Sequence, residues 1–132
     1  MLVYEQLSGE IVRACYEVHR VLGSKLLEKS YEDALSYELE LRGVNFKQQF
    51  PINLQYKGKE IGSYFADLLV EDKIILELKC VSNLSAEHYA QLLHYLNASN
   101  YALGILINFG TKELQVKRLL RTSEAISKPK SP

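Results

Sequence analysis

Two segments near the start of the chain carry apolar side chains at helical spacing. In residues 4–22 these side chains recur every three or four positions and line one face. Residues 27–42 repeat the pattern. Gly23 and Gly43 follow the two segments, and glycine commonly ends a helix. The pattern predicts two helices, each packing one face against a core.

Alternating apolar and polar residues take over after the helices, and this period of two is typical of strands. Pro51 interrupts the alternation, and Lys57-Gly58-Lys59 is typical of a hairpin turn. We expect four strands here, at residues 44–49, 52–56, 60–70 and 74–79.

One helix and two further strands are expected in the second half. Ser85 is a suitable N-cap for a helix that runs to about residue 98. Residues 101–109 are almost continuously apolar, which predicts a fully buried strand, and residues 114–120 alternate as a last strand. The strand–helix–strand unit over residues 74–109 should make its two strands parallel.

The predicted order is therefore ααββββαββ, an α/β (α+β) fold with a mixed sheet flanked by helices. A chain of 132 residues suits one compact domain, which we place at residues 1–121. Residues 122–132 are rich in Ser, Lys and Pro and are expected to form a disordered tail.

Composition narrows the setting of the protein. Sixteen basic residues balance sixteen acidic ones, so any nucleic-acid contact would need a local basic groove. Cys15 and Cys80 are too few for a disulfide framework. The sequence shows no signal-peptide pattern, and its longest apolar run, residues 101–107, is too short to span a bilayer. We expect a cytoplasmic protein without membrane contact.

Three charged residues lie in the otherwise apolar hairpin over residues 64–79: Asp67, Glu77 and Lys79. A charge in a buried strand is costly unless it is paired or binds a metal. Glu77 and Lys79 share one strand face. A three-residue loop at 71–73 would put Asp67 opposite Glu77, with Cβ atoms about 5 Å apart. A two-residue loop would turn Glu77 to the other face.

Two carboxylates at that separation repel each other unless a cation lies between them. Oxygen ligands suit Mg²⁺ or Mn²⁺, and Lys79 could position a water or stabilise developing negative charge. This is the minimal apparatus for metal-assisted hydrolysis of a phosphodiester. The spacing alone is loose, so a salt-bridge cluster at a sheet edge is an equally simple interpretation.

Further polar residues add to this group. Gln91 and Tyr95 share a face of the third helix with His88 beside them, and the preceding link brings that helix close to Lys79. Glu28 lies at the start of the second helix, where a carboxylate also complements the helix dipole. A solvated polar face is the alternative interpretation of Gln91 and Tyr95.

Taken together, six segments resemble the PD-(D/E)XK nuclease superfamily and, within it, the small bacterial group of GxxExxY proteins. The segments are residues 18–23 (VHRVLG), 26–35 (LLEKSYEDAL), 66–70 (ADLLV), 77–79 (ELK), 91–96 (QLLHYL) and 106–110 (LINFG). The resemblance covers nearly the whole chain apart from the tail. It implies a restriction-endonuclease-like mixed sheet flanked by helices, and metal-dependent cleavage of nucleic acid.

The resemblance also implies roles for individual residues. Asp67 and Glu77 fall on the metal-binding carboxylates, together with the backbone carbonyl of Leu78, and Lys79 falls on the catalytic lysine. Glu28 falls on the acidic residue of the first helical region, which completes the metal shell. Gln91 and Tyr95 match a Q-x-x-x-Y helix that supports the site or contacts substrate. One position departs from the pattern, because Lys25 stands where the signature has its first glycine.

The sequence thus favours a nuclease that uses Mg²⁺ or Mn²⁺ and acts on DNA. Phosphate contacts could come from five lysines: Lys25, Lys29, Lys47, Lys57 and Lys59. The alternative is a module that keeps the nuclease-like fold and binds nucleic acid or a protein without turnover. A homodimer is also compatible with the nine tyrosines and the exposed strand edges.

Overall fold

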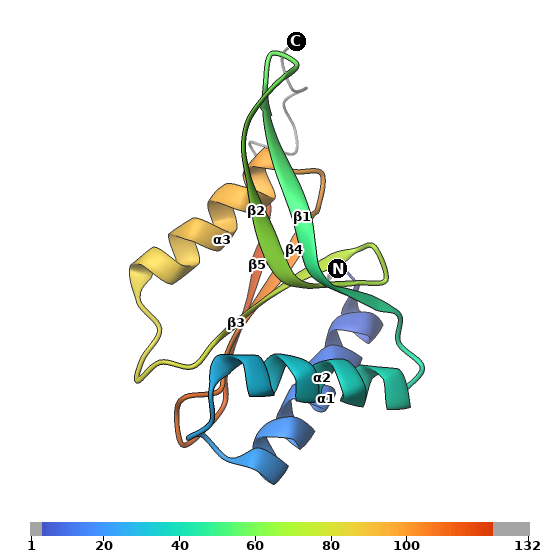
Figure 1. The fold of residues 1–132 in the computed structure, drawn as a ribbon, viewed down its shortest axis with the longest axis vertical. Helices are drawn as coiled ribbons and strands as arrows, with labels where there is room; N and C mark the ends of the chain where they lie inside the picture. Colours follow the sequence, from blue (N-terminus) through green and yellow to red (C-terminus); the bar gives the residue numbers. More distant parts are fainter. Residues whose placement is uncertain (1–3, 123–132) are drawn as a thin grey trace.

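A computed structural model of the chain describes residues 4–122, as three helices and one five-stranded sheet (Figure 1). The helices are α1 (Glu5–Leu22), α2 (Glu28–Leu41) and α3 (Ala86–Ala98). The strands are β1 (Phe46–Tyr56), β2 (Lys59–Val70), β3 (Ile74–Lys79), β4 (Leu103–Asn108) and β5 (Gln115–Leu120). The order ααβββαββ confirms an α/β fold, and all three predicted helices are present. The tail predicted beyond Thr122 lies outside the described residues.

The prediction of two strands around Pro51 is wrong. β1 is one continuous strand, so three strands and not four precede α3. β1 lies at the edge of the sheet, so one side of the strand has no neighbouring strand. Proline is tolerated there, because its lack of an N–H removes no hydrogen bond between strands. Pro51 stays in register opposite Phe65.

The strands follow the order β1-β2-β3-β4-β5 and form a mixed sheet. β3 and β4 pair in parallel, as the strand–helix–strand unit predicts, and the other neighbours are antiparallel. Leu68 pairs with Leu76 and Val70 with Ile74, which confirms the three-residue loop between β2 and β3. Glu71 and Asp72 in that loop adopt left-handed conformations, with φ values of 53° and 55°.

Helices cover both faces of the sheet. One core lies between the sheet and the α1–α2 pair and contains Ile11, Leu35, Leu76 and Ile105. The second core lies under α3 and contains Leu92, Leu96 and Leu106. Because β4 is covered on both faces, all six of its residues are buried, as its apolar run predicts. None of the helices in residues 4–122 is both long and apolar enough to cross a membrane.

β2 joins the main sheet only at its C-terminal end. It pairs with β3 only from Leu68 to Val70, but it pairs with β1 from Phe46↔Val70 to Tyr56↔Lys59. The free part of β1 and β2 extends beyond the sheet as a two-stranded arm (Figure 1). We call the point where β2 parts from β3, between Asp67 and Leu78, the fork. Beyond it, the end of β3 has a strand neighbour on one side only.

Candidate active site

Asp67 closes the fork. Its Oδ2 atom accepts a hydrogen bond of 2.7 Å from the backbone N–H of Leu78, which no longer faces β2. Its Oδ1 atom accepts a bond of 3.3 Å from the side-chain amide of Gln49. Asp67 therefore reaches the edge of β3 instead of standing beside Glu77 on a flat sheet face. Burial raises the pKa of Asp67, although the bond from Leu78 opposes the rise.

A second buried carboxylate, Glu32 on α2, supports this arrangement and was not singled out from the sequence. Its two carboxylate oxygens accept hydrogen bonds of 2.9 Å from the side-chain amides of Gln48 and Gln49. Gln49 thereby links Glu32 to Asp67, and it does so with a left-handed backbone, at φ 51°. The available signal was that Glu28 and Glu32 are four residues apart and share a helix face.

Glu77 and Lys79 line a cleft of about 210 Å³ on the α3 side of the sheet. The side chain of Lys79 makes no ion pair or hydrogen bond with another described residue. The Oε1 atom of Glu77 is buried and, within residues 4–122, has no hydrogen-bond partner. A buried carboxylate oxygen without a partner is unusual and costly.

Negative charges converge on Glu77. Burial raises the pKa of this carboxyl group to about 8, and the charge of Asp67 adds to the rise. The nearby ammonium of Lys79 opposes it, while Glu28 and Glu32 raise the pKa further. The protein therefore disfavours the charged form of Glu77 unless positive charge is brought to it.

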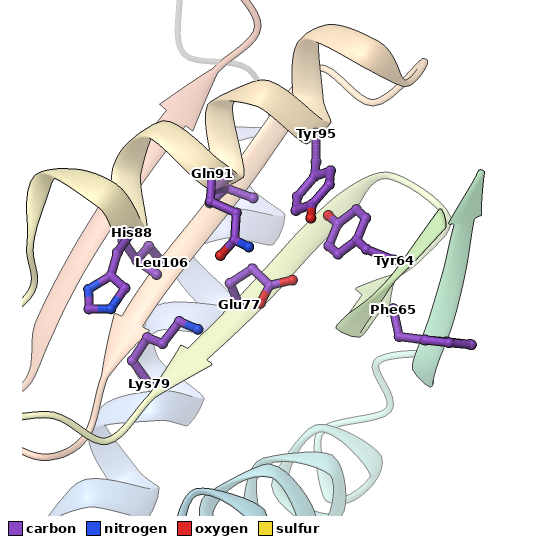
Figure 2. Close-up of a pocket in the computed structure, with 9 residues that line it drawn as sticks. Tyr64, Phe65, Glu77, Lys79, His88, Gln91, Tyr95 and Leu106 are labelled. Atoms are coloured by element: carbon purple, nitrogen blue, oxygen red, sulfur yellow. The ribbon is translucent and has the colours of Figure 1, made fainter. Parts of the chain in front are cut away.

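The α3 residues predicted from the sequence lie in the same cleft. Figure 2 shows the side chains of Gln91 and Lys79 directed toward Glu77. The ring of Tyr95 stacks on that of Tyr64, with centroids 3.4 Å apart and planes 10° from parallel. Tyr64, from β2, was not singled out from the sequence, because its position in an alternating strand resembles that of any core-facing aromatic residue.

The start of α3 is fixed by Ser85, the predicted N-cap. The backbone N–H of Ser85 donates a hydrogen bond of 3.0 Å to Nδ1 of His88, which also lines the cleft. This reciprocal cap fixes the first turn of α3, the helix from which Gln91 and Tyr95 line the cleft.

Glu28 approaches the group from α2, of which it is the first residue. Although the residue as a whole is exposed, partial burial of its carboxyl group and the charge of Asp67 raise its pKa, and Lys79 opposes the rise. Glu28 does not line the cleft. The left-handed turn before α2 falls on Gly23, at φ 75°, so Lys25 in place of the signature glycine causes no backbone strain.

The end of β3 is clamped to the end of β4 by Asn108, which is fully buried. Its side chain accepts a hydrogen bond from the Val81 N–H and donates one to the Val81 carbonyl, each 3.0 Å long. The backbone of Phe109 donates to the carbonyl of Lys79 at 2.9 Å. These bonds fix the backbone from which the Lys79 side chain enters the cleft.

The donor set suits a hard divalent cation. Within residues 4–122 no three His, Cys, Asp or Glu side chains form a ready-made metal cage. Mg²⁺, however, is usually held by one or two carboxylates and keeps several waters. Asp67 at the fork and the buried Oε1 atom of Glu77 are such donors. The residues present therefore fit Mg²⁺ or Mn²⁺ better than zinc.

Two of the five lysines proposed for phosphate contacts are already paired. Lys29 lies 3.1 Å from Asp33 and 3.5 Å from Glu32, and Lys47 lies 3.4 Å from Asp72. The structure thus leaves Lys25, Lys57 and Lys59 as the better candidates among the five.

The fold and the site define an α/β domain of the restriction-endonuclease-like class, with an acidic residue at the fork and a Glu-x-Lys pair on the next strand. Comparison with protein families agrees: the PD-(D/E)XK nuclease superfamily matches residues 5–119, and the chain belongs to this superfamily. The match shows the superfamily and does not by itself show the narrower GxxExxY group. None of the curated proteins matches the sequence.

Proposed function

We propose that this protein is a metal-dependent nuclease that hydrolyses phosphodiester bonds in DNA, and that it is a GxxExxY-type member of its superfamily. One observation carries the proposal. Within residues 4–122, Glu77 has a buried carboxylate oxygen without a hydrogen-bond partner, and it lines a cleft together with Lys79, whose ammonium is unpaired among the same residues. Such an oxygen is costly to the fold, and binding of a cation would satisfy it.

Asp67, Glu77 and the backbone carbonyl of Leu78 would hold Mg²⁺ or Mn²⁺, and Glu28 would complete the shell directly or through water. The carbonyl of Leu78 belongs to this set because the N–H and C=O of one strand residue point to the same side. The Leu78 N–H points into the fork, toward Asp67. When bound, the cation would polarise the phosphate and activate the attacking water.

Lys79 would position that water and stabilise the negative charge that develops on the phosphate. Its backbone is clamped, and its side chain has no competing ion pair within the described part of the chain. Gln91 would contact the substrate or orient Lys79, because its amide lies in the same cleft. Tyr95 would support this wall through its stacking on Tyr64.

Cleavage of plasmid and of single-stranded DNA in Mg²⁺ tests the proposal. We expect Lys79→Ala to lower the rate by about a hundredfold or more, since it removes a group that acts on the developing charge. Lys112→Ala, at an exposed position away from the cleft, is the matched control and should cleave like the parent. Equal rates for the parent and Lys79→Ala would show that the proposed site is wrong.

Calorimetry separates the nuclease from a binding module on the same fold. We expect the parent to bind Mg²⁺ and Glu77→Gln to lose most of this affinity, because an amide oxygen is a weaker ligand than a carboxylate. A parent protein that binds DNA but no Mg²⁺ would favour the binding module.

A further inference from the structure

Tyr64 lines the same cleft as Lys79. It lies on β2, three residues before Asp67, and its ring stacks on Tyr95. The ring also packs against the core under α3. The apolar part of Tyr64 is thus accounted for by packing, and its hydroxyl group is not.

The hydroxyl oxygen of Tyr64 is buried and has no hydrogen-bond partner in the described part of the protein. Tyr64 and Glu77 line the same cleft, and the Oε1 atom of Glu77 also lacks a partner among the described residues. A donor and an acceptor therefore lie in one cleft without satisfying each other. Leaving a buried hydroxyl unbonded is costly, so its retention points to a group that enters the cleft.

Tyr31 provides an internal comparison. It is fully buried, and like Tyr64 it stacks on an aromatic ring, that of Phe109, with centroids 4.7 Å apart. Its hydroxyl group donates to the Gly23 carbonyl at 2.6 Å and accepts from the Leu26 N–H at 3.2 Å. A structural tyrosine in this fold thus satisfies its hydroxyl group fully, which Tyr64 does not.

We infer that the Tyr64 hydroxyl donates a hydrogen bond to a non-bridging phosphate oxygen of the nucleic acid bound in the cleft. The inference rests on the proposed function and adds a substrate-binding residue to it. A phosphate suits the site because its oxygens accept hydrogen bonds and carry no proton. Lys79 and Gln91 line the same cleft and supply further donors, so that separate oxygens of one phosphodiester can be held.

The test measures binding of a fluorescent DNA oligonucleotide in Mg²⁺, with Lys79→Ala present in every variant to prevent turnover. Tyr64→Phe should lower the affinity about ten- to a hundredfold, the range expected for a lost hydrogen bond to a charged acceptor. Calorimetry with Mg²⁺ alone should show unchanged metal affinity. Tyr89→Phe, which packs against the same core but does not line the cleft, is the control and should bind DNA normally.

Thermal unfolding distinguishes a substrate contact from a structural role. Tyr64→Phe removes an unsatisfied buried hydroxyl, so its Tm should equal or exceed that of the parent. Tyr31→Phe should lower Tm by a few degrees, since it breaks two hydrogen bonds. A clear fall in Tm for Tyr64→Phe would overturn the inference in favour of a structural role.

The outcomes also separate the inference from the proposed function. Equal DNA affinity with tyrosine or phenylalanine at position 64 would overturn the inference and leave the nuclease proposal intact. A parent protein that binds no DNA at all would overturn both.

Discussion

At Glu77, the stability of the fold and the proposed binding of a cation favour different protonation states of the carboxyl group. Its carboxylate is buried beside other negative charges, and among the described residues the ammonium of Lys79 opposes them. In the absence of a cation, folding therefore favours the protonated carboxyl group. Since the folded pKa of about 8 lies above the ordinary value of 4.5, the contribution of this group to stability is fully present below about pH 4.5. The contribution is lost as the pH rises through about 8.

Replacing Glu77 with Gln should remove this dependence. In EDTA, we expect the parent to lose stability relative to Glu77→Gln between about pH 4.5 and pH 8, by about 1 kcal/mol or more at the upper end. Denaturant unfolding across this pH range measures the difference. Adding Mg²⁺ at pH 8 should stabilise the parent and leave Glu77→Gln nearly unchanged. Parallel stability curves for the two proteins would contradict the assigned environment of Glu77.

The residues of the candidate site were predictable from the sequence to different degrees. Asp67, Glu77 and Lys79 stand out because charges interrupt apolar strands. Glu32 does not stand out, because a glutamate on an amphipathic helix is usually solvated. Its burial results from Gln48 and Gln49, which lie on another element and reach it only in the folded chain. The pattern of residues along the sequence does not reveal which side chains come into contact in the folded chain.

At the scale of elements, local patterns predicted the helices and the buried β4, and they failed at Pro51. The interruption at Pro51 is real in the sequence, but its effect depends on whether the strand lies at an edge of the sheet. The order of strands in a sheet depends on the whole chain. The alternation of apolar and polar residues around Pro51 therefore could not show whether this strand lies at an edge. The junction that follows β4 is likewise shaped by a tertiary contact, the approach of Gly110 to the chain after β3.

Gly110 allows this approach, because it has no side chain. A Cβ atom there would lie 2.5 Å from the Val81 nitrogen and 2.7 Å from the Cys80 carbonyl carbon. We expect Gly110→Ala to cost about 2 kcal/mol or more, since backbone atoms cannot move aside as a flexible side chain would. Gly62→Ala is the control, because its Cβ atom would meet only Leu54 at an ordinary 3.9 Å. Equal unfolding midpoints for Gly110→Ala and the parent would refute the close approach.

At the scale of the whole molecule, the chain carries no net charge and its surface lysines are partly neutralised. The class of fold and the pairing of β3 with β4 followed from the sequence alone. The fork did not, because alternation within β2 and β3 does not specify the length over which the two strands pair. DNA binding to such a surface should depend on the cleft more than on general electrostatic attraction.

The salt dependence of the DNA affinity measures how much of the binding is due to general electrostatic attraction. Each neutralised phosphate contributes about −0.7 to −0.9 to the slope of log K against log salt concentration. With Lys29 and Lys47 engaged in ion pairs, we expect few phosphate contacts and a slope shallower than about −3. Fluorescence anisotropy between 50 and 200 mM salt, about the usual range for such titrations, gives this slope. A slope steeper than about −6 would indicate an extended basic interface instead.

The hydrogen bond between Asp67 and the Leu78 N–H closes the fork, so this carboxylate has a structural role in addition to the metal-binding role that we propose for it. Lys79 has no comparable partner within the described residues. If a descendant lineage lost its need for cleavage, mutations at Lys79 would accumulate freely, whereas mutations at Asp67 would still be selected against for their effect on folding. Under the proposed function, Lys79 and not Asp67 is therefore the residue whose presence would distinguish a working enzyme from an inactive descendant of the same fold.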